Sequence, residues 1–429
     1  MKTLSSLCAV GIAVLLLSSC GGSGSSGGSS GATDTGTGPL SFDAFQSFSG
    51  PDASFGPEQI AGCAPAAQAI VAAGGILHHK QVSCDATDNR GDPADAVPAA
   101  ESLIATNSHL VGVLGPGSNE APPTVPLFNR AHIPMFSDSG QGLYSKNTLR
   151  YFWRITPPDD AVGYAMALWA HAKGYTRVAS VFGQSIGAQG SAPTVTAGFK
   201  KLGGTISTAQ LIALDQSSYR TEVSQMAAGH PQAIFIELDP QSAATYMSEV
   251  AQLYHVVPII GTDGTTQPPW LKAVSGVLGK STFDRYYVGA QPYAPATGPA
   301  HDLFLAQLQA AAAKVTKPLA QWETDSFSEA AWDSINIMSL AMLLAKNTNP
   351  VVWNSYIPRV TNPGPGHVIV HDFAQGKQAI LAGKQITYIG ATGPVTFDRF
   401  QNSPGQFEIV NAAGATLKTY TAGDLQAAK

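Results

Sequence analysis

The stretch Val111-Gly-Val-Leu-Gly-Pro-Gly-Ser118 is a short apolar run that ends in glycines, a proline and a hydroxyl-bearing side chain. An unbroken apolar run of this length is typical of a strand buried on both faces, as in a parallel sheet. Ser118 stands where a helix can begin and could cap it, and the free N–H groups of a helix start attract anions such as carboxylates. The stretch therefore predicts one edge of a ligand pocket, and a serine that only caps the helix is the alternative.

Strand-like and helix-like segments alternate along most of the chain. A first series has strand patterns at 40–48, 81–86, 111–114 and 133–137 and helical patterns at 59–73, 93–106 and 122–130. After a proline-bearing segment at 152–159, a second series has strand patterns at 177–182, 206–213, 233–236 and 257–260 and helical patterns at 161–173, 192–202, 220–228 and 242–253. Beyond Tyr293 we expect a return to the first series through helices at 300–314 and 326–344 and short strands at 385–388 and 394–397. The alternation predicts an α/β fold of doubly wound parallel sheets, and 429 residues suffice for two lobes.

The first residues have the features of a targeting segment. Lys2 precedes an apolar stretch from Ala9 to Leu17, which is too short to span a bilayer. Leu17-Ser-Ser-Cys20 resembles a bacterial lipobox, in which the cysteine is acylated and becomes the first mature residue; an ordinary signal with an incidental cysteine is the alternative. We expect a lipoprotein signal peptide at 1–19 and a disordered Gly/Ser-rich tether at 20–39.

Two of the four cysteines remain once the signal and the lipidated Cys20 are set aside. Cys63 and Cys84 are then an even pair in an oxidising compartment, which predicts a disulfide between the first helix and the second strand. It would close a loop of about 20 residues and stabilise the fold by roughly 3 kcal/mol. Two free buried thiols are the alternative.

Composition and motifs exclude several classes of function. Charged residues make up only 12% of the chain and the net charge is -5, so no nucleic-acid partner is expected. The chain has no GxxxxGK[ST] loop, and Gly115-Pro-Gly-Ser-Asn-Glu120 lacks the third glycine of the dinucleotide fingerprint. His78-His79 has no further ligands at zinc spacing. We therefore expect neither a cofactor nor a metal.

Two further strand ends resemble the opening stretch. The strand at 133–137 leads into Ser137-Asp-Ser-Gly-Gln141, and the strand at 257–260 leads into Gly261-Thr-Asp-Gly264. Ligands of open α/β sheets bind outside the carboxyl ends of the strands, so these segments are expected to converge. Ser118, Ser139 and Gln141 could donate to a carboxylate while Asp263 accepts from an ammonium group, which predicts a site for a zwitterion. Asp263 could equally be only a turn residue.

A competing motif lies in the second series. Gly183-Gln-Ser-Ile-Gly187 matches G-x-S-x-G between a strand and a helix, which is the context of a hydrolase nucleophile elbow. On chain order, Ser185 could be joined by Asp239 or Asp263 and by a later histidine; the candidates are His301, His367 and His371. No HGGG-type oxyanion segment precedes the motif, so the serine hydrolase is the less favoured hypothesis.

Taken together, these residues resemble the type I periplasmic substrate-binding proteins of the leucine/isoleucine/valine-binding family, which serve ABC transporters. The resemblance covers roughly residues 41–409, and its markers are Gly50-Pro-Asp-Ala-Ser-Phe-Gly56, Ala72-Ala-Gly-Gly-Ile76, Asp88 to Pro93, Gly115-Pro-Gly-Ser118, Ile133-Pro-Met-Phe-Ser137, Phe152-Trp-Arg154 with Asp159, Ala331-Trp-Asp333 and Tyr388-Ile-Gly-Ala-Thr-Gly-Pro-Val-Thr-Phe-Asp398. It implies two lobes joined by three hinge crossings near Pro157, Pro292 and Gly405, with residues 40–157 and 293–404 in the first lobe and 158–292 and 405–429 in the second. The ligand would be trapped between the lobes by closure.

The resemblance also assigns roles to single positions. The carboxylate binders of the family fall near Ser118, Ser139 and Gln141, its ammonium acceptor falls on Asp263, and its covering aromatic falls on Phe55. Where many members have Tyr-Gly, this chain has Ile186-Gly187, so a hydroxyl or stacking ring is lost, and Ile186 is expected to line the ligand site with an apolar side chain. Trp270, in a Pro-Pro-Trp turn beyond Asp263, is a further candidate to line the cleft.

The resulting hypothesis is an extracytoplasmic, lipid-anchored, solute-binding component of an ABC importer. It would close on a small amino acid, branched-chain or related, or on an amide, and it would not be an enzyme. The expected partners are that ligand and the transporter permease, with membrane contact only through the lipid on Cys20; a monomer is expected. A ligand-sensing lipoprotein that reports to a membrane receptor is the alternative among binding proteins.

Overall fold

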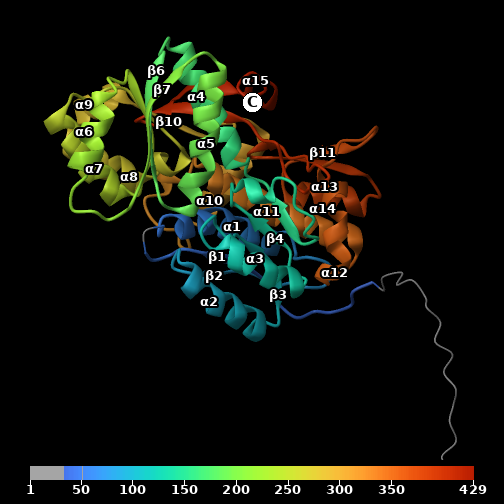
Figure 1. Ribbon diagram of the computed structural model, residues 1–429. Helices are drawn as coiled ribbons and strands as arrows, with labels where there is room; N and C mark the ends of the chain where they lie inside the picture. The colour runs from blue at the N-terminus through green and yellow to red at the C-terminus, as the bar shows by residue number, and fades with distance from the viewer. Residues whose placement is uncertain (1–32, 51) are drawn as a thin grey trace, which may run out of the picture. The chain divides into compact units, whose positions relative to one another are not determined.

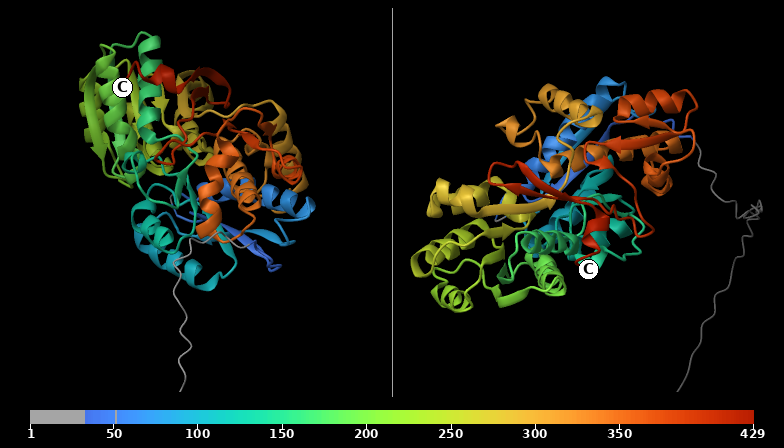
Figure 2. Two further views of the ribbon diagram at one scale, coloured as in Figure 1. Left: turned by 90° about the vertical axis from the view of Figure 1, so that its right-hand side faces the viewer. Right: turned by 90° about the horizontal axis from the view of Figure 1, so that it is seen from above.

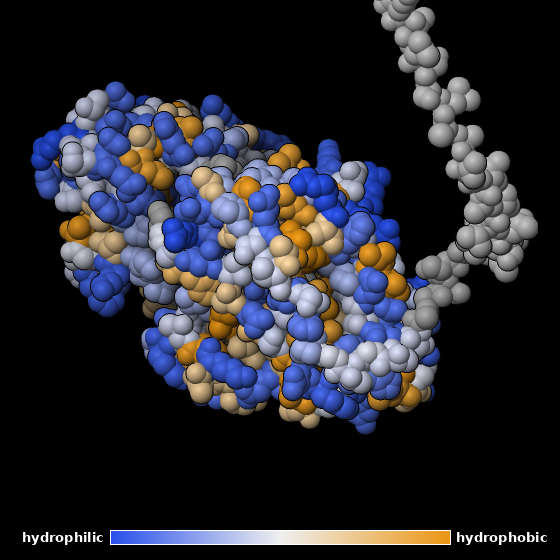
Figure 3. Space-filling model, turned by 90° about the horizontal axis from the view of Figure 1, so that it is seen from below, coloured by the Kyte–Doolittle hydropathy of each residue, from blue (hydrophilic) through white to orange (hydrophobic). Residues whose placement is uncertain are grey.

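The computed structural model describes residues 33–50 and 52–429 (Figure 1). The expected signal peptide, Cys20 and most of the expected tether lie outside the described residues. In the part that is described, no helix combines the length and the hydropathy needed to cross a membrane. On the face drawn in Figure 3, hydrophilic side chains predominate and hydrophobic ones lie in smaller groups between them.

The first sheet has five parallel strands in the order β2-β1-β3-β4-β5. The strands are β1 (Leu40–Gln46), β2 (Val82–Asp88), β3 (Leu110–Leu114), β4 (Met135–Ser137) and β5 (Phe152–Arg154). The opening stretch of the sequence forms β3, which is buried along its whole length. The prediction of a strand covered on both faces is therefore confirmed.

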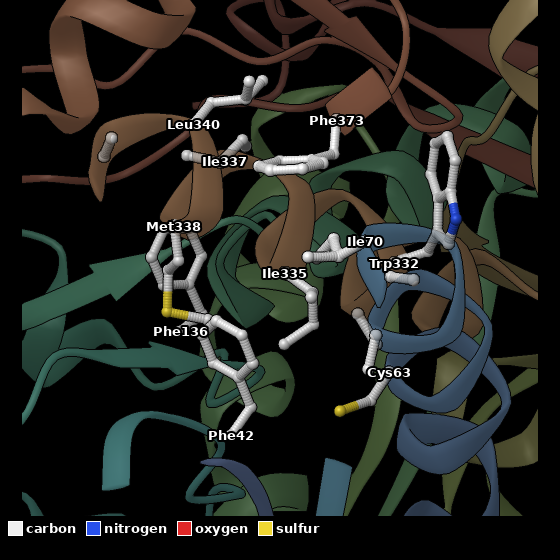
Figure 4. Close-up of a cluster of buried hydrophobic side chains, with 14 of the residues drawn as sticks. Phe42, Cys63, Ile70, Phe136, Trp332, Ile335, Ile337, Met338, Leu340 and Phe373 are labelled. Carbon is white, nitrogen blue, oxygen red and sulfur yellow. The ribbon is translucent and has the colours of Figure 1, made fainter. Parts of the chain in front are cut away.

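Helices cover both faces of this sheet because successive side chains of a strand point to opposite sides. On β1, Phe42 enters the core that α1, α10 and α11 build, whereas Phe45 enters the core that α2 and α3 build. Figure 4 shows Phe42 and Phe136 of the sheet beside Met338 of α11. The helices are α1 (Phe55–Ala72), α2 (Pro93–Thr106), α3 (Ala121–Arg130), α10 (Pro299–Ala310) and α11 (Ser326–Ala345).

The second sheet has seven strands in the order β15-β14-β10-β9-β8-β6-β7. Five are parallel, namely β6 (Arg177–Gly183), β7 (Thr205–Ile212), β8 (Ala233–Glu237), β9 (Ile259–Gly261) and β10 (Tyr287–Pro292). The antiparallel strands β14 (Phe407–Asn411) and β15 (Thr416–Tyr420) complete the sheet. The sequence patterns did not indicate these two strands, because β15 is mostly exposed and a turn separates it closely from β14.

This sheet is also covered on both sides. Val178 and Phe182 of β6 enter the core beside α4 and α5, whereas Ala179 and Val181 enter the core beside the other helices. The helices on the first side are α4 (Asp159–Ala172), α5 (Ile186–Lys201) and α15 (Ala422–Leu425), and those on the second are α6 (Arg220–Ala228), α7 (Pro240–Leu253), α8 (Pro268–Leu278) and α9 (Lys280–Tyr286). The predicted pair of doubly wound sheets is thus present, and below we call each sheet with its helices the first and the second lobe.

A small third sheet lies on the first lobe in the order β11-β12-β13. It comprises β11 (Val368–Val370), β12 (Ile386–Gly390) and β13 (Gly393–Pro394), with α12 (Pro350–Trp353), α13 (Ile357–Thr361) and α14 (Phe373–Leu381) beside it. The strand predicted at 394–397 is shorter than expected, since Val395 and Phe397 instead pack into the large core of the first lobe. The return of the chain to the first lobe through α10 and α11 is confirmed.

Close helix packing and a disulfide hold α1 in place. A Cβ atom at Gly62 would lie only 2.1 Å from the carbonyl oxygen of Ser328, so this position of α1 needs glycine for α11 to approach. Cys63 of α1 is bonded to Cys84 of β2, and their Cα atoms are 5.8 Å apart. The predicted disulfide is therefore confirmed.

Three segments lead from one lobe to the other, at 155–158, 293–298 and 403–406, and they lie side by side (Figure 2). The backbone N–H of Tyr293 donates to the carbonyl of Gln406 at 2.8 Å, and that of Ser403 donates to the carbonyl of Arg154 at 2.8 Å. Gly405 has a φ of 54°, and a Cβ atom there would lie 2.2 Å from Pro157 Cγ. The three connections therefore form one packed bundle.

Candidate functional site

A cavity of about 390 Å³ lies where the carboxyl ends of strands from both lobes meet. The first lobe contributes residues that follow β1, β3 and β4, and the second lobe contributes residues that follow β6, β8 and β9. This is the place where open α/β sheets bind their ligands, and the size is within the range of small-molecule sites. Of the predicted ligand-binding residues whose side chains are described, which do not include Ile186, three line it, namely Phe55, Ser118 and Asp263.

Ser118 lines the cavity because the chain turns sharply after β3. Gly115 has a φ of 102°, and a Cβ atom there would lie 2.4 Å from the carbonyl oxygen of Phe45. Helix α3 begins three residues beyond Ser118, with Glu120 in the capping position and no side-chain cap. The hypothesis that Ser118 caps this helix is therefore wrong, and its hydroxyl instead faces the Ser139 hydroxyl at 3.4 Å.

Ser139 and Gln141 lie behind Ser118 and do not line the cavity. The Gln141 side-chain amide donates to the Ser118 carbonyl, so its donor is already used within the first lobe. The guanidinium of Arg154 donates to the carbonyl of Gln141 at 2.9 Å. The two residues therefore hold the loop that presents Ser118, and the expected three-residue carboxylate site is reduced to the Ser118 hydroxyl.

Asp263 follows β9 and enters the cavity from the second lobe. Burial raises the pKa of its carboxyl to about 6, and the charge of Asp138 across the cavity raises it too, while the N–H groups of Asp263 and Gly264 hold it down. Phe55 lies at the start of α1 and packs edge-to-face against Phe327, with 6.4 Å between ring centroids. The structure thus places a carboxylate and an aromatic wall on opposite lobes.

Trp270 does not line the cavity, so that prediction is wrong. Its side chain is 1% exposed in the core of the second lobe, where its ring lies 5.4 Å from that of Tyr287. The indole N–H donates to the carbonyl of Leu238 at 3.0 Å. The Pro-Pro-Trp segment is not a loop: Pro268 and Pro269 open α8, and the helix turns Trp270 towards the sheet.

The residues of the G-x-S-x-G motif do not form a catalytic triad with the histidines nominated above. Ile186 is the first residue of α5, and the Ser185 hydroxyl caps this helix by accepting from the N–H of Ala188 at 3.3 Å. None of those histidines lines the cavity. The Nδ1 atom of His301 contacts Glu329, that of His367 contacts Thr387, and that of His371 contacts the carbonyl of Ile389. All of these residues lie in the part of the chain that builds the first lobe. Ser185 has a structural role as a helix cap.

Six carboxylates that the sequence did not predict as ligand-binding also line the cavity: Asp52, Glu120, Asp138, Asp159, Glu237 and Asp239. Most share one signal, because they follow the ends of predicted strands, where the ligand rule applied to Asp263 holds equally. Asp138 comes directly after β4, Glu237 ends β8, and Asp239 caps α7 by accepting from the N–H groups of Gln241 and Ser242. A list of the acidic residues at strand ends would have included these three.

Burial and mutual repulsion make these carboxyls hard to ionise. Burial raises the pKa of Glu237 to about 8, helped by the charge of Asp263. It raises the pKa of Glu120 to about 7 and that of Asp138 to about 6. Burial and the charges of Asp263 and Glu237 raise the pKa of Asp159 well above its usual value. In an empty closed cavity these carboxyls therefore tend to hold protons, because their ionised forms would repel one another across the two lobes.

No group of side chains in the described residues has the arrangement to hold a metal ion. The cavity contains carboxylates, hydroxyls, amides and the two phenyl rings of Phe55 and Phe327. Such a lining can accept hydrogen bonds and enclose an apolar segment, and it offers no charge for an anion.

Comparisons with known proteins agree with this geometry. The family model described as a periplasmic binding protein matches residues 44–351. The comparison with curated proteins found no match. Among solved structures, the leucine-binding protein LivK of Thermotoga maritima aligns with a TM-score of 0.70 at 15% identity, over 90% of this chain and 99% of LivK.

Two further structures show how varied the ligands of this fold are. LivJ of Streptococcus pneumoniae, solved with isoleucine, aligns with a TM-score of 0.70 at 19% identity, over 90% of this chain and 99% of LivJ. A solute-binding protein of an ABC transporter from R. palustris, solved with benzoate, aligns with a TM-score of 0.68 at 14% identity, over 89% of this chain and 96% of that chain. Isoleucine is a zwitterion and benzoate an anion. The ligand of a protein with this fold therefore depends on the side chains of its cavity and not on the fold itself.

Proposed function

This chain belongs to the periplasmic binding proteins, and from that premise we propose that it captures a small amine-bearing solute, such as an amino acid or a related amide, for an ABC importer. One observation carries the proposal: the cavity joins Asp263 of the second lobe with Phe55 and Ser118 of the first. Asp263 would accept from the ammonium group of the solute, the Ser118 hydroxyl would bind its polar end, and Phe55 would cover it.

The three connections at 155–158, 293–298 and 403–406 would serve as the hinge. They are adjacent and hydrogen-bonded to one another, so rotation there can separate the lobes without breaking either sheet. Gly187 of the second lobe lies close to Ser118 of the first, since a Cβ atom at Gly187 would be 3.8 Å from Ser118 Cβ. The present arrangement therefore corresponds to the closed state in this proposal.

We also propose that Cys20 carries the lipid that anchors the protein to the membrane outside the cytoplasm, in the periplasm or at the outer face of the cell. The proposal depends on the Leu17-Ser-Ser-Cys20 sequence and on the Gly/Ser-rich segment that follows it. Cys20→Ala should abolish incorporation of labelled palmitate and release the protein into the soluble fraction. Label that persists in this variant would remove the lipoprotein assignment.

A thermal-shift screen of the purified full-length mature protein tests the ligand proposal. Amino acids, their amides, simple amines and aromatic acids are added in turn, because a ligand that binds only the folded state raises the melting temperature. We expect amine-bearing compounds to stabilise the protein and aromatic acids to have no effect. Stabilisation by the acids alone, or labelling of Ser185 by a fluorophosphonate, would contradict the proposal.

A further inference from the structure

The cavity contains more carboxyl groups than a single ammonium group can satisfy. Seven carboxylates line it, and no lysine, arginine or histidine does so among the described residues. None of the ion pairs formed by the described residues includes one of these seven carboxylates. The charge of Arg154 acts to lower the pKa of Asp159, but Arg154 forms no ion pair with it. Its guanidinium donates instead to Asn402, to Ser145 and to the carbonyl of Gln141.

The first lobe holds its three carboxylates with neutral donors. The Asn119 side-chain amide donates to Asp52 at 2.8 Å, and the Gln46 side-chain amide donates to Asp138 at 2.8 Å. The Ser47 hydroxyl donates to Glu120 at 2.8 Å. These hydrogen bonds fix the position of each carboxylate and leave its charge uncompensated.

Some carboxylate oxygens of the second lobe have no hydrogen-bond partner, although the hydroxyls of Thr262 and Ser191 lie close enough to Glu237 to lower its pKa. Glu237 Oε2 and Asp159 Oδ2 are buried and unpartnered, and both side chains line the cavity. Glu237 lies near the loop after β9, since a Cβ atom at Gly264 would be 3.7 Å from Glu237 Oε1. A buried carboxylate without a donor destabilises the closed state, so these oxygens require a donor that the chain itself does not supply.

From this arrangement we propose that the solute carries at least two positive charges, as in a linear diamine or polyamine, and that one charged end lies among Asp52, Glu120 and Asp138 and the other among Asp159, Glu237 and Asp263. The inference rests on the proposed function, because it names the class of solute for the same cavity. A primary ammonium group has three donors and no acceptor, which suits a site of acceptors alone. The carboxylate of an amino acid would instead meet the Ser118 hydroxyl and the negative charges around it.

The same charges explain how such a solute would drive closure. In the closed state, the charge of Asp138 in the first lobe raises the pKa of Asp263 in the second, and the charge of Asp239 in the second lobe raises the pKa of Asp52 in the first. Without a cation, this repulsion between the lobes favours opening. A dication that contacts both groups of carboxylates removes the repulsion and links the lobes.

Isothermal titration calorimetry with matched compounds tests the inference on the folded mature protein. Putrescine and spermidine are compared with butylamine, which has one charge, with 4-aminobutyrate and leucine, which are zwitterions, and with calcium chloride. We expect putrescine or spermidine to bind at least about tenfold more tightly than butylamine, and the zwitterions and calcium to bind weakly or not at all.

Variants assign the binding to this cavity. Glu237→Gln and Asp138→Asn each remove one negative charge from a different group and should each weaken putrescine binding at least about tenfold. Asp284→Asn is the matched control, because Asp284 lies in α9 outside the cavity and pairs with exposed Lys280 at 2.6 Å. It should leave the affinity unchanged, and near-ultraviolet circular dichroism of each variant shows that the fold is retained.

The outcomes separate this inference from the proposed function. Tight binding of leucine or butylamine with no gain for the diamines would overturn the inference and leave the amine-binding proposal standing. Tight binding of calcium alone would overturn both, as would the absence of binding by every amine in the panel. Equal effects of Glu237→Gln and Asp284→Asn would overturn the assignment to this cavity.

Discussion

Asp263 contributes to the site through its charge, and that charge can be removed with little change in shape. Asp263→Asn keeps the size of the side chain but leaves a neutral amide opposite the ammonium group of the solute. A charge-assisted hydrogen bond contributes about 1.5–3 kcal/mol, so the affinity should fall by roughly one to two orders of magnitude. Calorimetric titration with the best ligand of the screen measures this loss of affinity, and Asp284→Asn is the control.

Unlike Asp263, Trp270 is expected to contribute to the stability of the fold and not to ligand binding. Trp270→Phe removes the indole N–H from the Leu238 carbonyl in a fully buried environment. We expect a loss of about 1–3 kcal/mol in the free energy of unfolding. Urea titration measures this loss. Ligand affinity should not change, and a weakened affinity would show that Trp270 shapes the cavity.

Among the elements, α1 depends on its covalent link to β2. The Cys63–Cys84 disulfide spans 21 positions in sequence. In the chain-entropy view, removing such a loop closure costs roughly 3 kcal/mol. The double variant Cys63→Ala/Cys84→Ala should therefore unfold at a clearly lower urea concentration than the parent. A midpoint equal to that of the parent would mean that packing of α1 on α11 suffices without the covalent link.

Helix α11 organises the small third sheet through one buried carboxylate. Asp333 accepts from the Tyr388 hydroxyl at 2.7 Å, from the N–H of Ala391 at 2.8 Å, and from the N–H and hydroxyl of Thr392 at 2.9 and 2.6 Å. Asp333→Ala would leave these four donors, two buried and two partly buried, without their acceptor, at a cost of about 3–5 kcal/mol. Hydrogen exchange should show the amides of 388–392 losing protection first, whereas uniform loss across the first lobe would contradict this local role.

At the scale of the whole molecule, the buried carboxyls predict how stability depends on pH. The pKa is raised to about 8 for Glu237, to about 7 for Glu120 and Asp43, and to about 6 for Asp138. Unfolded carboxyls titrate near pH 4, so the folded chain binds more protons between about pH 4 and pH 8. Their stabilising contribution is complete below about pH 4 and is lost as the pH rises towards 8.

The ligand-free protein should therefore have a lower melting temperature at pH 8 than at pH 5. The other carboxyls that face the cavity are Asp52, Asp159, Asp239 and Asp263, and the charge of Arg154 acts to lower the pKa of Asp159. Differential scanning calorimetry from pH 4.5 to pH 8.5 measures the trend, and Glu237→Gln should reduce it. A melting temperature that rises with pH over this range would contradict the assigned ionisation states.

Much of the fold followed from short-range patterns. The apolar run of β3 and the alternation of strands and helices are local properties, so both lobes and the return of the chain through α10 and α11 were predictable. The disulfide also followed, from the count of cysteines left after the targeting segment. Strands β14 and β15 did not, because an exposed edge strand such as β15 carries little periodic signal.

The candidate site was predictable only in its location. The rule that ligands bind beyond strand ends indicated Ser118 and Asp263, and both line the cavity. It could not tell that Ser139 and Gln141 point into the first lobe, or that α8 turns Trp270 towards the sheet. The orientation of a side chain near a helix start depends on where the helix begins, and local sequence specifies that boundary poorly.

By itself, the sequence determined two α/β lobes with a pocket at the strand ends, since hydrophobic periodicity and glycine turns act over a few residues. Only the tertiary structure decided the charge of that pocket. Asp138 and Glu237 are 99 positions apart in sequence, each unremarkable alone, and they belong to one site because two sheets present their carboxyl ends to the same cavity. Electrostatic energy depends on distance in space and on burial, and neither is a property of a local stretch of chain.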